Sequence, residues 1–227
     1  MEKKDFPIKL GFAGDVMLGR LVDQVIQAKG PRYIWGDVLP LLEEPDLTFA
    51  NLECVIAQGG EPFHPPRAFY FRALPRAIDA LTMAGIGYVS MANNHAMDFR
   101  AAALIETLQH LDKHRIAHAG AGESLVEASK PALVEARGIK IGAVAFADHF
   151  REYGAGRNSP GINITKISLK EETFKRIREA IQSARHGGAD VVIFSIHWGP
   201  NMRQAPTRKF IEFAHAVMDA GADIYHG

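Results

Sequence analysis

The sequence has one cysteine, no long apolar run and no net charge, and each absence excludes a class of protein. Cys54 is the only cysteine among 227 residues, so an internal disulfide is impossible and the fold depends on packing. No apolar stretch reaches the roughly 18 residues that a membrane-spanning helix needs. Lysine plus arginine (26) balances aspartate plus glutamate (26), so no overall field attracts nucleic acid or an anionic membrane. An anionic ligand therefore needs a local binding site.

The N-terminal segment has basic residues but lacks the apolar core of a secretory signal. Residues 1–12 read MEKKDFPIKLGF, in which Asp5 and Pro7 interrupt the apolar positions. A signal peptide needs a continuous apolar region of about 7–15 residues after its basic residues. We therefore predict no signal peptide, and a location in the cytoplasm or at the periphery of a membrane.

The chain is long enough for one large domain, and we predict a single domain over residues 1–227. Short apolar runs alternate with segments of helical spacing, which is typical of an α/β fold. The predicted strands are 8–13, 47–50, 86–92, 116–119, 132–136, 140–147, 191–196 and 224–225. The predicted helices include 21–26, 74–84, 104–111, 174–184 and 210–217. Residues 58–67 and 151–161 are predicted to be loops.

Four side chains that can bind metals stand at the ends of predicted strands. Asp15, Glu53, His95 and His197 each lie at or just past the carboxyl end of an apolar run. Ligands of open α/β sheets gather at this edge. Carboxylate, amide and imidazole groups are the ligand types that hold manganese, iron or zinc. The four ends together therefore predict a metal site.

The first two strand ends carry carboxylates. In GDVMLGR, Asp15 can ligate a metal and Arg20, at the start of a helix, can hold a phosphate oxygen. The alternative makes Asp15 a helix N-cap and Arg20 a solvated side chain. In FANLE, either Asn51 or Glu53 can face the site, and their i, i+2 spacing places both on one face if the strand continues. In the alternative interpretation, Asn51 stabilises a turn and Glu53 is a surface residue.

The third strand end is dense in polar groups, in the run ANNHAMD. The Asn94 amide oxygen can bind a metal, and His95 can protonate a leaving oxygen. Asp98, three residues on, can orient the His95 imidazole. The alternative is an asparagine-capped helix with a hydrogen-bonded histidine. We favour a functional role for these residues, because polar groups buried at this density need hydrogen-bond or metal partners.

His197 follows a strand whose β-branched composition predicts a central position in a sheet. Gly199, two residues on, leaves room for close approach of another group. A lone histidine here is more often a satisfied core residue than a ligand. Convergence with the other three strand ends favours the ligand interpretation. Among the other histidines, His64 and His149 lie in predicted loops from which they could reach a site, and the rest are interpreted as structural or solvent-facing.

The quoted motifs form a series that resembles a known family. GDVMLGR, FANLECVI, ANNHAMDF, GAGES and HWGPN occur in this order and cover nearly the whole chain. The series resembles that of the CapA-type poly-γ-glutamate capsule biosynthesis proteins, a branch of the calcineurin-like metallophosphoesterase superfamily. ANNHAMD and GDVMLGR carry most of the specificity.

The resemblance implies an α/β (α+β) fold, a two-sheet β-sandwich flanked by helices. It implies that Asp15, Glu53, Asn94 and His197 are metal ligands and that His95 is the catalytic acid. The implied cofactors are two divalent ions of manganese, iron or zinc. Such pairs lie roughly 3.5–4 Å apart and clamp a phosphate.

The sequence departs from the family pattern at several positions. Met17 stands where the superfamily has the histidine of Asp-x-His, a difference that the CapA branch shares. Arg100 replaces a glycine, and Asn201 replaces a common acidic residue. Gly227 matches the first glycine of the family's histidine-rich metal loop, so the resemblance implies a domain truncated at its C-terminus. His226 precedes that glycine and is not counted as a ligand.

The leading hypothesis is a metal-dependent phosphoesterase-like protein of poly-γ-glutamate or other cell-envelope polymer biosynthesis. It takes a phosphorylated or polyanionic substrate, with polymer synthase subunits as partners and no nucleic acid. One alternative is a non-catalytic subunit that binds polymer or synthase through the same cleft. Another is a generic nucleotidase or phosphodiesterase. The methionine at position 17 favours impaired or atypical catalysis.

Overall fold

The computed structural model describes residues 7–227, and its packing divides the chain into two compact units. The signal-peptide prediction rests largely on residues 1–6, which lie outside the described residues. The first unit comprises 7–89, 95–118 and 135–139, and the second comprises 90–94, 119–134 and 140–227. The single domain over 1–227 stays a prediction.

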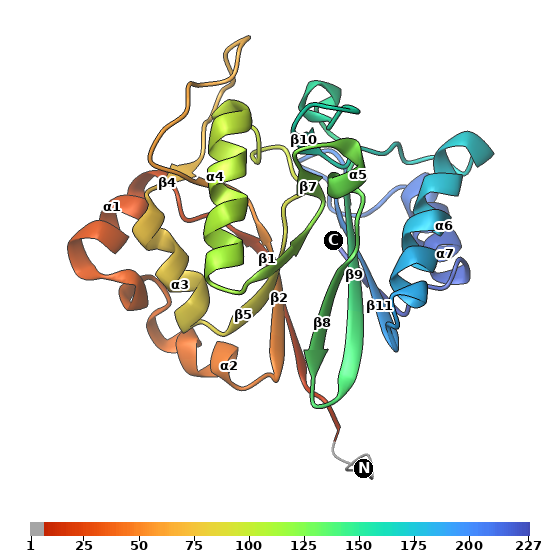
Figure 1. The fold of residues 1–227 in the computed structure, drawn as a ribbon, viewed down its shortest axis with the longest axis horizontal. Coiled ribbons are helices and arrows are strands. Elements are labelled where there is room, and N and C mark those ends of the chain that lie inside the picture. The colour runs from red at the N-terminus through yellow and green to blue at the C-terminus, as the bar shows by residue number, and fades with distance from the viewer. Residues whose placement is uncertain (1–6) are drawn as a thin grey trace. The chain divides into compact units, whose positions relative to one another are not determined.

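The first unit is built on a four-stranded sheet in the order β1-β2-β5-β6 (Figure 1). Its strands are β1 (Leu10–Val16), β2 (Leu47–Leu52), β5 (Ile86–Ser90) and β6 (Ala117–Ala119), with the short pair β3 (Val55–Ile56) and β4 (Arg72–Ala73). Its α-helices are α1 (Arg20–Lys29), α2 (Leu39–Glu43), α3 (Ile78–Met83) and α4 (Arg100–Lys113), and its 3-10 turns are Pro31–Ile34, Gly36–Val38 and Pro75–Ala77.

Burial in the first unit follows the sequence pattern. β2 is buried from Thr48 onward, as expected of a parallel strand covered on both faces. α4 buries a stripe of residues at helical spacing, among them Leu104, Leu108 and Leu111. Thr107 on the same stripe bonds the Ile56 amide at 2.9 Å, which ties α4 to β3.

The second unit is built on a four-stranded sheet in the order β12-β11-β9-β8. Its strands are β8 (Ala132–Ala136), β9 (Ile139–Ala147), β11 (Val191–His197) and β12 (Ile224–His226), with the short pair β7 (Ala121–Gly122) and β10 (Gly161–Ile162). Its helices are α5 (Leu125–Ala128), α6 (Glu171–His186) and α7 (Arg208–Asp219), with a 3-10 turn at Arg151–Tyr153. β11 pairs in parallel with both β9 and β12.

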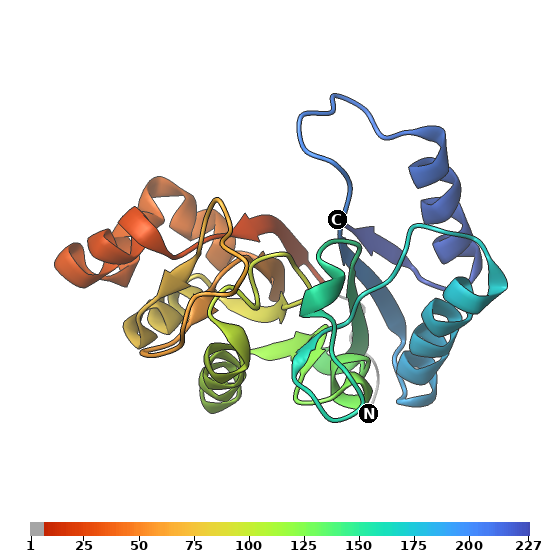
Figure 2. The same ribbon diagram turned by 90° about the horizontal axis from the view of Figure 1, so that it is seen from above.

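The core of the second unit forms where α6 and α7 cover this sheet. The two helices lie side by side in both views (Figures 1 and 2). Phe174 of α6 meets Phe213 of α7 edge-on at 6.1 Å between ring centroids, and Phe213 meets Phe194 of β11 at 6.4 Å. Fully buried aromatic rings of this size contribute much of a core's stability.

The predicted α/β class is confirmed, while several element boundaries differ. β1 runs on through Asp15, so that residue lies within the strand and not after it. Strand β5 stops at Ser90 because residues 91–99 turn toward α4. The helix predicted over 74–84 is a 3-10 turn followed by the short α3. No helix among residues 7–227 combines the length and apolar character that a membrane span requires.

Candidate metal centre

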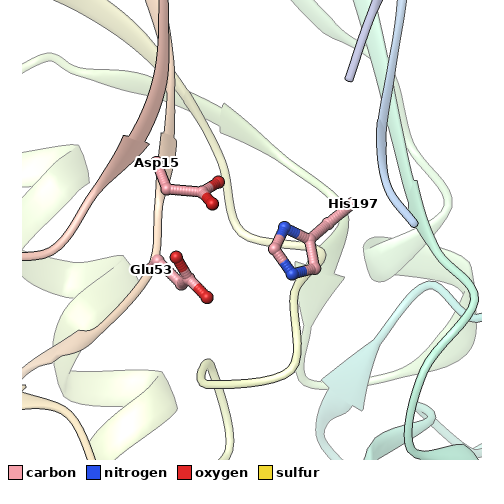
Figure 3. Close-up of side chains that lie close together, drawn as sticks. All are labelled: Asp15, Glu53 and His197. Atoms are coloured by element: carbon pink, nitrogen blue, oxygen red, sulfur yellow. The ribbon is translucent and has the colours of Figure 1, made fainter. Parts of the chain in front are cut away.

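Two carboxylates come together at the ends of neighbouring strands in the first unit. Asp15 lies next to the end of β1, and Glu53 directly follows β2. Parallel pairing aligns Asp15 with Asn51, and the Glu53 amide donates to Val16 O at 3.0 Å. Both carboxylates project from these ends, and one oxygen of each lies within 4.8 Å of the other (Figure 3). Carboxylates this close repel each other unless a cation or a shared proton compensates.

The Asn51 side chain holds the Asp15 carboxylate in place. Its Nδ2 donates to Asp15 Oδ1 at 2.8 Å, and the residue is buried within β2. The turn predicted as the alternative for Asn51 is therefore wrong. The N-cap alternative for Asp15 is also wrong, because the N-cap of α1 is Gly19.

His95 stands beside Glu53 and is held in place from two directions. Its Nε2 lies 3.8 Å from Glu53 Oε1. Its Nδ1 lies 2.6 Å from Asp98 Oδ2, and that oxygen also accepts the Phe71 amide proton at 2.8 Å. The Phe71 ring stacks on the imidazole at 3.9 Å between centroids. The predicted contact between Asp98 and His95 is confirmed.

Asn94 presents a buried oxygen that needs a partner. Among residues 7–227, its Oδ1 has no hydrogen-bond partner. The predicted alternative of an asparagine cap is wrong, because α4 begins later and Phe99 is its N-cap. An unsatisfied buried acceptor costs about 1–3 kcal/mol, so such an atom in a native protein is expected to bind a water, an ion or a ligand.

His197 is the last residue of β11 in the second unit (Figure 3). β11 lies between β12 and β9, so the predicted central position of this strand is confirmed. Gly199, two residues on, has φ +85°, a conformation that glycine adopts without strain. The backbone therefore turns sharply just after the imidazole.

Asp148 is a partner of this strand end that was not predicted from the sequence: its amide donates to His197 O, and its Oδ2 accepts the Gly199 amide proton, both at 3.3 Å. Asp148 and His149 follow β9, the neighbour of β11, and the His149 ring centroid lies 6.1 Å from that of His197. The Asp148 carboxylate, whose Oδ1 lies 2.5 Å from His149 Nδ1, raises the pKa of His149 above its ordinary value. The strand-end rule that found His197 applies equally to the Asp-His pair after Ala147.

Arg20 and Met17 differ from the other predicted site residues. Arg20 is the exposed first residue of α1, with φ +56°, and its guanidinium lies 5.3 Å from the Phe69 ring centroid. The Met17 sulfur accepts the Gly19 amide proton at 3.1 Å. A thioether thus lies at a position that offers no imidazole to a metal.

The cavity beside Asp15 is largely apolar. It encloses about 500 Å³ between β1, α1 and the turn that follows α1. Trp35 is fixed in its wall by a hydrogen bond from Nε1 to Ala80 O at 2.9 Å. Its other lining residues are Val16, Met17, Leu18, Leu21, Val22, Val25, Tyr33 and Ile34. A ligand held at Asp15 therefore meets a hydrophobic wall.

The donors of the first unit fit a hard or borderline divalent cation. Asp15 and Glu53 offer a close pair of carboxylates, and His95 offers an imidazole beside Glu53. In the second unit, the buried Asn94 oxygen is also of a ligand type that such cations accept. A cation would relieve the carboxylate repulsion and a ligand would satisfy the amide oxygen.

Comparison with known proteins gives a consistent family. The model of the bacterial capsule synthesis protein family PGA_cap matches residues 9–227. A probable polyglutamine synthesis accessory protein of Mycobacterium tuberculosis is 29% identical over 94% of this chain and 66% of its own length. The PGA biosynthesis protein CapA of Bacillus subtilis is 28% identical over 98% of this chain and 57% of its own length. The chain thus spans between about half and two thirds of these relatives.

A solved structure shares the fold at low sequence identity. A hypothetical protein from Thermus thermophilus aligns over 96% of this chain and 66% of its own, with a TM-score of 0.51 and 18% identity. That likeness supports the mixed α/β architecture. The match across residues 9–227 confirms the resemblance that the motif series indicated. The chain belongs to the bacterial capsule synthesis protein family PGA_cap.

Proposed function

We propose that this chain is a metal-dependent phosphoesterase-like protein that acts in the synthesis of poly-γ-glutamate or a related cell-envelope polymer. The observation that carries the proposal is the carboxylate pair Asp15 and Glu53, with oxygens within 4.8 Å, beside the anchored His95. The polymer assignment rests on relatives named as capsule and PGA biosynthesis proteins. The substrate class is a phosphorylated or polyanionic compound, and synthase subunits are the proposed partners.

The proposed metal ligands are Asp15 and Glu53 of the first unit together with Asn94 and His197. The unpaired Asn94 oxygen and the strand-end position of His197 support their inclusion. The proposed fold is the two-sheet sandwich of the calcineurin-like superfamily, with two divalent ions. When bound, divalent ions supply Lewis-acid polarisation of a phosphoryl oxygen.

His95 is the proposed general acid. The Asp98 carboxylate accepts a hydrogen bond from Nδ1–H, which leaves Nε2 as the nitrogen that exchanges a proton with a substrate. Hydrolysis forms a bond from a water oxygen to phosphorus and breaks the bond from phosphorus to the leaving oxygen. In this step the imidazolium form of His95 gives its Nε2 proton to the leaving oxygen and keeps its Nδ1 proton. The stacked Phe71 ring excludes water from one face of the imidazole. Arg20, at the start of α1, is proposed to hold a phosphate oxygen.

The test is hydrolysis of an aryl phosphate with added Mn²⁺, compared between the wild type and His95→Gln. The proposal expects metal-dependent turnover that falls about 100-fold or more in the variant, as general-acid catalysis contributes roughly 10²–10⁴-fold. His110→Gln is the matched control, since this histidine pairs with Glu106 on α4 at 3.6 Å. Equal turnover by wild type and His95→Gln would reject the catalytic role.

One observation favours a second function, a non-catalytic accessory subunit. The Met17 thioether occupies the position of a superfamily ligand and bonds the Gly19 amide instead. A relative is named a synthesis accessory protein. Under this alternative, metal binds at Asp15 and Glu53 without any turnover, and the centre serves to hold polymer or synthase. Metal binding measured beside turnover separates the two functions.

A further inference from the structure

A pocket of the second unit carries more positive than negative charge. It encloses about 370 Å³ between the 3-10 turn Arg151–Tyr153, strand β10 and the first turns of α6. Its cationic lining residues are Arg151, Lys166 and Arg176, against the single carboxylate of Glu172. The volume is at the lower end of the roughly 300–1,000 Å³ found for ligand pockets.

Arg176 is the anchor of this pocket. Its Nη1 donates to Ile164 O at 3.0 Å, and its Nη2 donates to Asn163 Oδ1 at 2.7 Å. Both acceptors are neutral, so neither hydrogen bond compensates the charge of the half-buried guanidinium, on which the Glu179 carboxylate of the same helix acts through space. Loss of solvent around it lowers the pKa of Arg176 from its usual value, although a guanidinium remains charged near neutral pH. Its remaining N–H groups can donate to an anion.

The other two cations are exposed and lack an acidic partner. Within the described chain, neither Arg151 nor Lys166 forms an ion pair or a side-chain hydrogen bond. Three other arginines of the same unit do pair with acids: Arg178 with Glu171, Arg185 with Asp223 and Arg208 with Glu212. Three cationic side chains against one carboxylate make the pocket a local positive site in a chain with no net charge.

The pocket surface also has apolar stretches between its charges. Leu125, Ile162 and Ile164 line it, and Thr165 and Thr173 add hydroxyl groups. A γ-linked glutamate chain presents two methylene groups and one carboxylate per residue. The methylene groups match the apolar surface, and the carboxylates match the guanidinium and ammonium groups.

We propose that this pocket binds the carboxylates of a γ-linked glutamate polymer, at a subsite separate from the metal ligands. The identity of the polymer rests on the proposed function, while the anionic character of the ligand rests on the charges of the pocket. The ligand contacts Arg176 and is held at the rim by Arg151 and Lys166.

The test is binding of a fluorescently labelled γ-glutamate oligomer, followed by anisotropy, to the wild type and to the double variant Arg151→Gln/Lys166→Gln. Both side chains are exposed, so the substitutions leave the fold intact. We expect the double variant to bind at least about tenfold more weakly, because each charge-assisted hydrogen bond contributes roughly 1.5–3 kcal/mol. Arg203→Gln/Lys209→Gln removes the same two charge types from exposed positions outside this pocket and should bind like the wild type.

Two further measurements separate this inference from the proposed function. Asp15→Asn should lose Mn²⁺ binding and keep the oligomer, which supports a separate polymer subsite. Equal affinity of the two double variants for the oligomer would reject the pocket as its binding site and would leave the proposed metal centre unaffected. Binding of inorganic phosphate with no binding of the oligomer would also overturn the inference, since the ligand would then be a phosphate.

Discussion

At the scale of single residues, the account depends on side chains whose orientation is fixed by neighbours. Asp98 is 1% exposed and accepts hydrogen bonds from both the His95 ring and the Phe71 amide. Buried polar groups of this kind decide which nitrogen of an imidazole carries its proton. A substitution there tests positioning without removing the imidazole itself.

Asp98→Asn should lower turnover by about 10–100-fold, the usual effect of losing a carboxylate behind a functional histidine. Without the negative charge of the carboxylate, the tautomer with its proton on Nδ1 loses stabilisation, so the share of the neutral ring with its proton on Nε2 rises. Nitrogen-15 NMR of the His95 ring reports this change of tautomer directly. Asp112→Asn is the control, because Asp112 pairs with His118 at 3.1 Å on the surface. An unchanged His95 tautomer would contradict the positioning role.

Substitution of Tyr88 is expected to stabilise the protein. Its buried hydroxyl lacks a hydrogen-bond partner in the part of the chain that the structure describes. Tyr88→Phe should raise the free energy of unfolding by about 1 kcal/mol, because it removes an unsatisfied polar group. Burial raises the pKa of Tyr88 above its ordinary value, so the folded state keeps its proton at a pH where the unfolded state ionises. Wild-type stability therefore falls as pH rises above about 10.

Urea unfolding at pH 7.5 and pH 10.5 measures both effects of Tyr88→Phe. The variant should lose less stability than the wild type between these pH values. Tyr70→Phe is the control, because the Tyr70 hydroxyl donates to Phe63 O and accepts from the Arg67 amide, both at 2.8 Å. That variant should be destabilised. A Tyr88→Phe protein less stable than wild type at pH 7.5 would refute the prediction.

At the scale of helices and strands, the sequence located elements well where apolar spacing was regular. β11 and the buried stripe of α4 follow directly from periodicity. Boundaries were missed where contacts across the chain decide them: β1 continues through Asp15 because it pairs with β2 there. Strands β7 and β10 are two residues long, too short to show a periodic pattern in the sequence. They are recognised as strands only because they pair with each other.

The sequence also predicted the residues of the candidate site better than the contacts that support them. The strand-end rule identified Asp15, Glu53, His95 and His197, because it needs only strand positions. The support that Asn51 gives Asp15 required the register between β1 and β2, which the sequence does not state. Asp148 was missed although it follows β9, since no family motif drew attention to it.

Strand β10 offers a test at this scale. A methyl group at Gly161 would overlap Tyr153 O and Ala155 N, which are backbone atoms that cannot move independently. Gly161→Ala should therefore cost about 1–3 kcal/mol of stability, as overpacking does. Gly14→Ala is the control, because nothing lies within 4 Å of its added methyl. Thermal unfolding that is equal for both variants would contradict this packing.

At the scale of the whole molecule, the balance of charges makes local clusters decide what binds. A chain with 26 basic and 26 acidic residues exerts no overall attraction on a polyanion or a cation. We propose that cations bind at the carboxylates of the first unit and anions in the pocket of the second. The affinity for cations should change only with substitutions of these carboxylates, and the affinity for anions only with substitutions in the pocket.

Titration calorimetry of Mn²⁺ into the wild type, Asp15→Asn, Glu53→Gln and Asp37→Asn tests the central claim most directly. Asp37 is an exposed carboxylate in the turn Gly36–Val38 and serves as the control. We predict that the wild type and Asp37→Asn bind alike, and that either substitution of the carboxylate pair weakens binding at least about tenfold. Equal Mn²⁺ affinity in all four proteins would contradict the assignment of Asp15 and Glu53 as metal ligands.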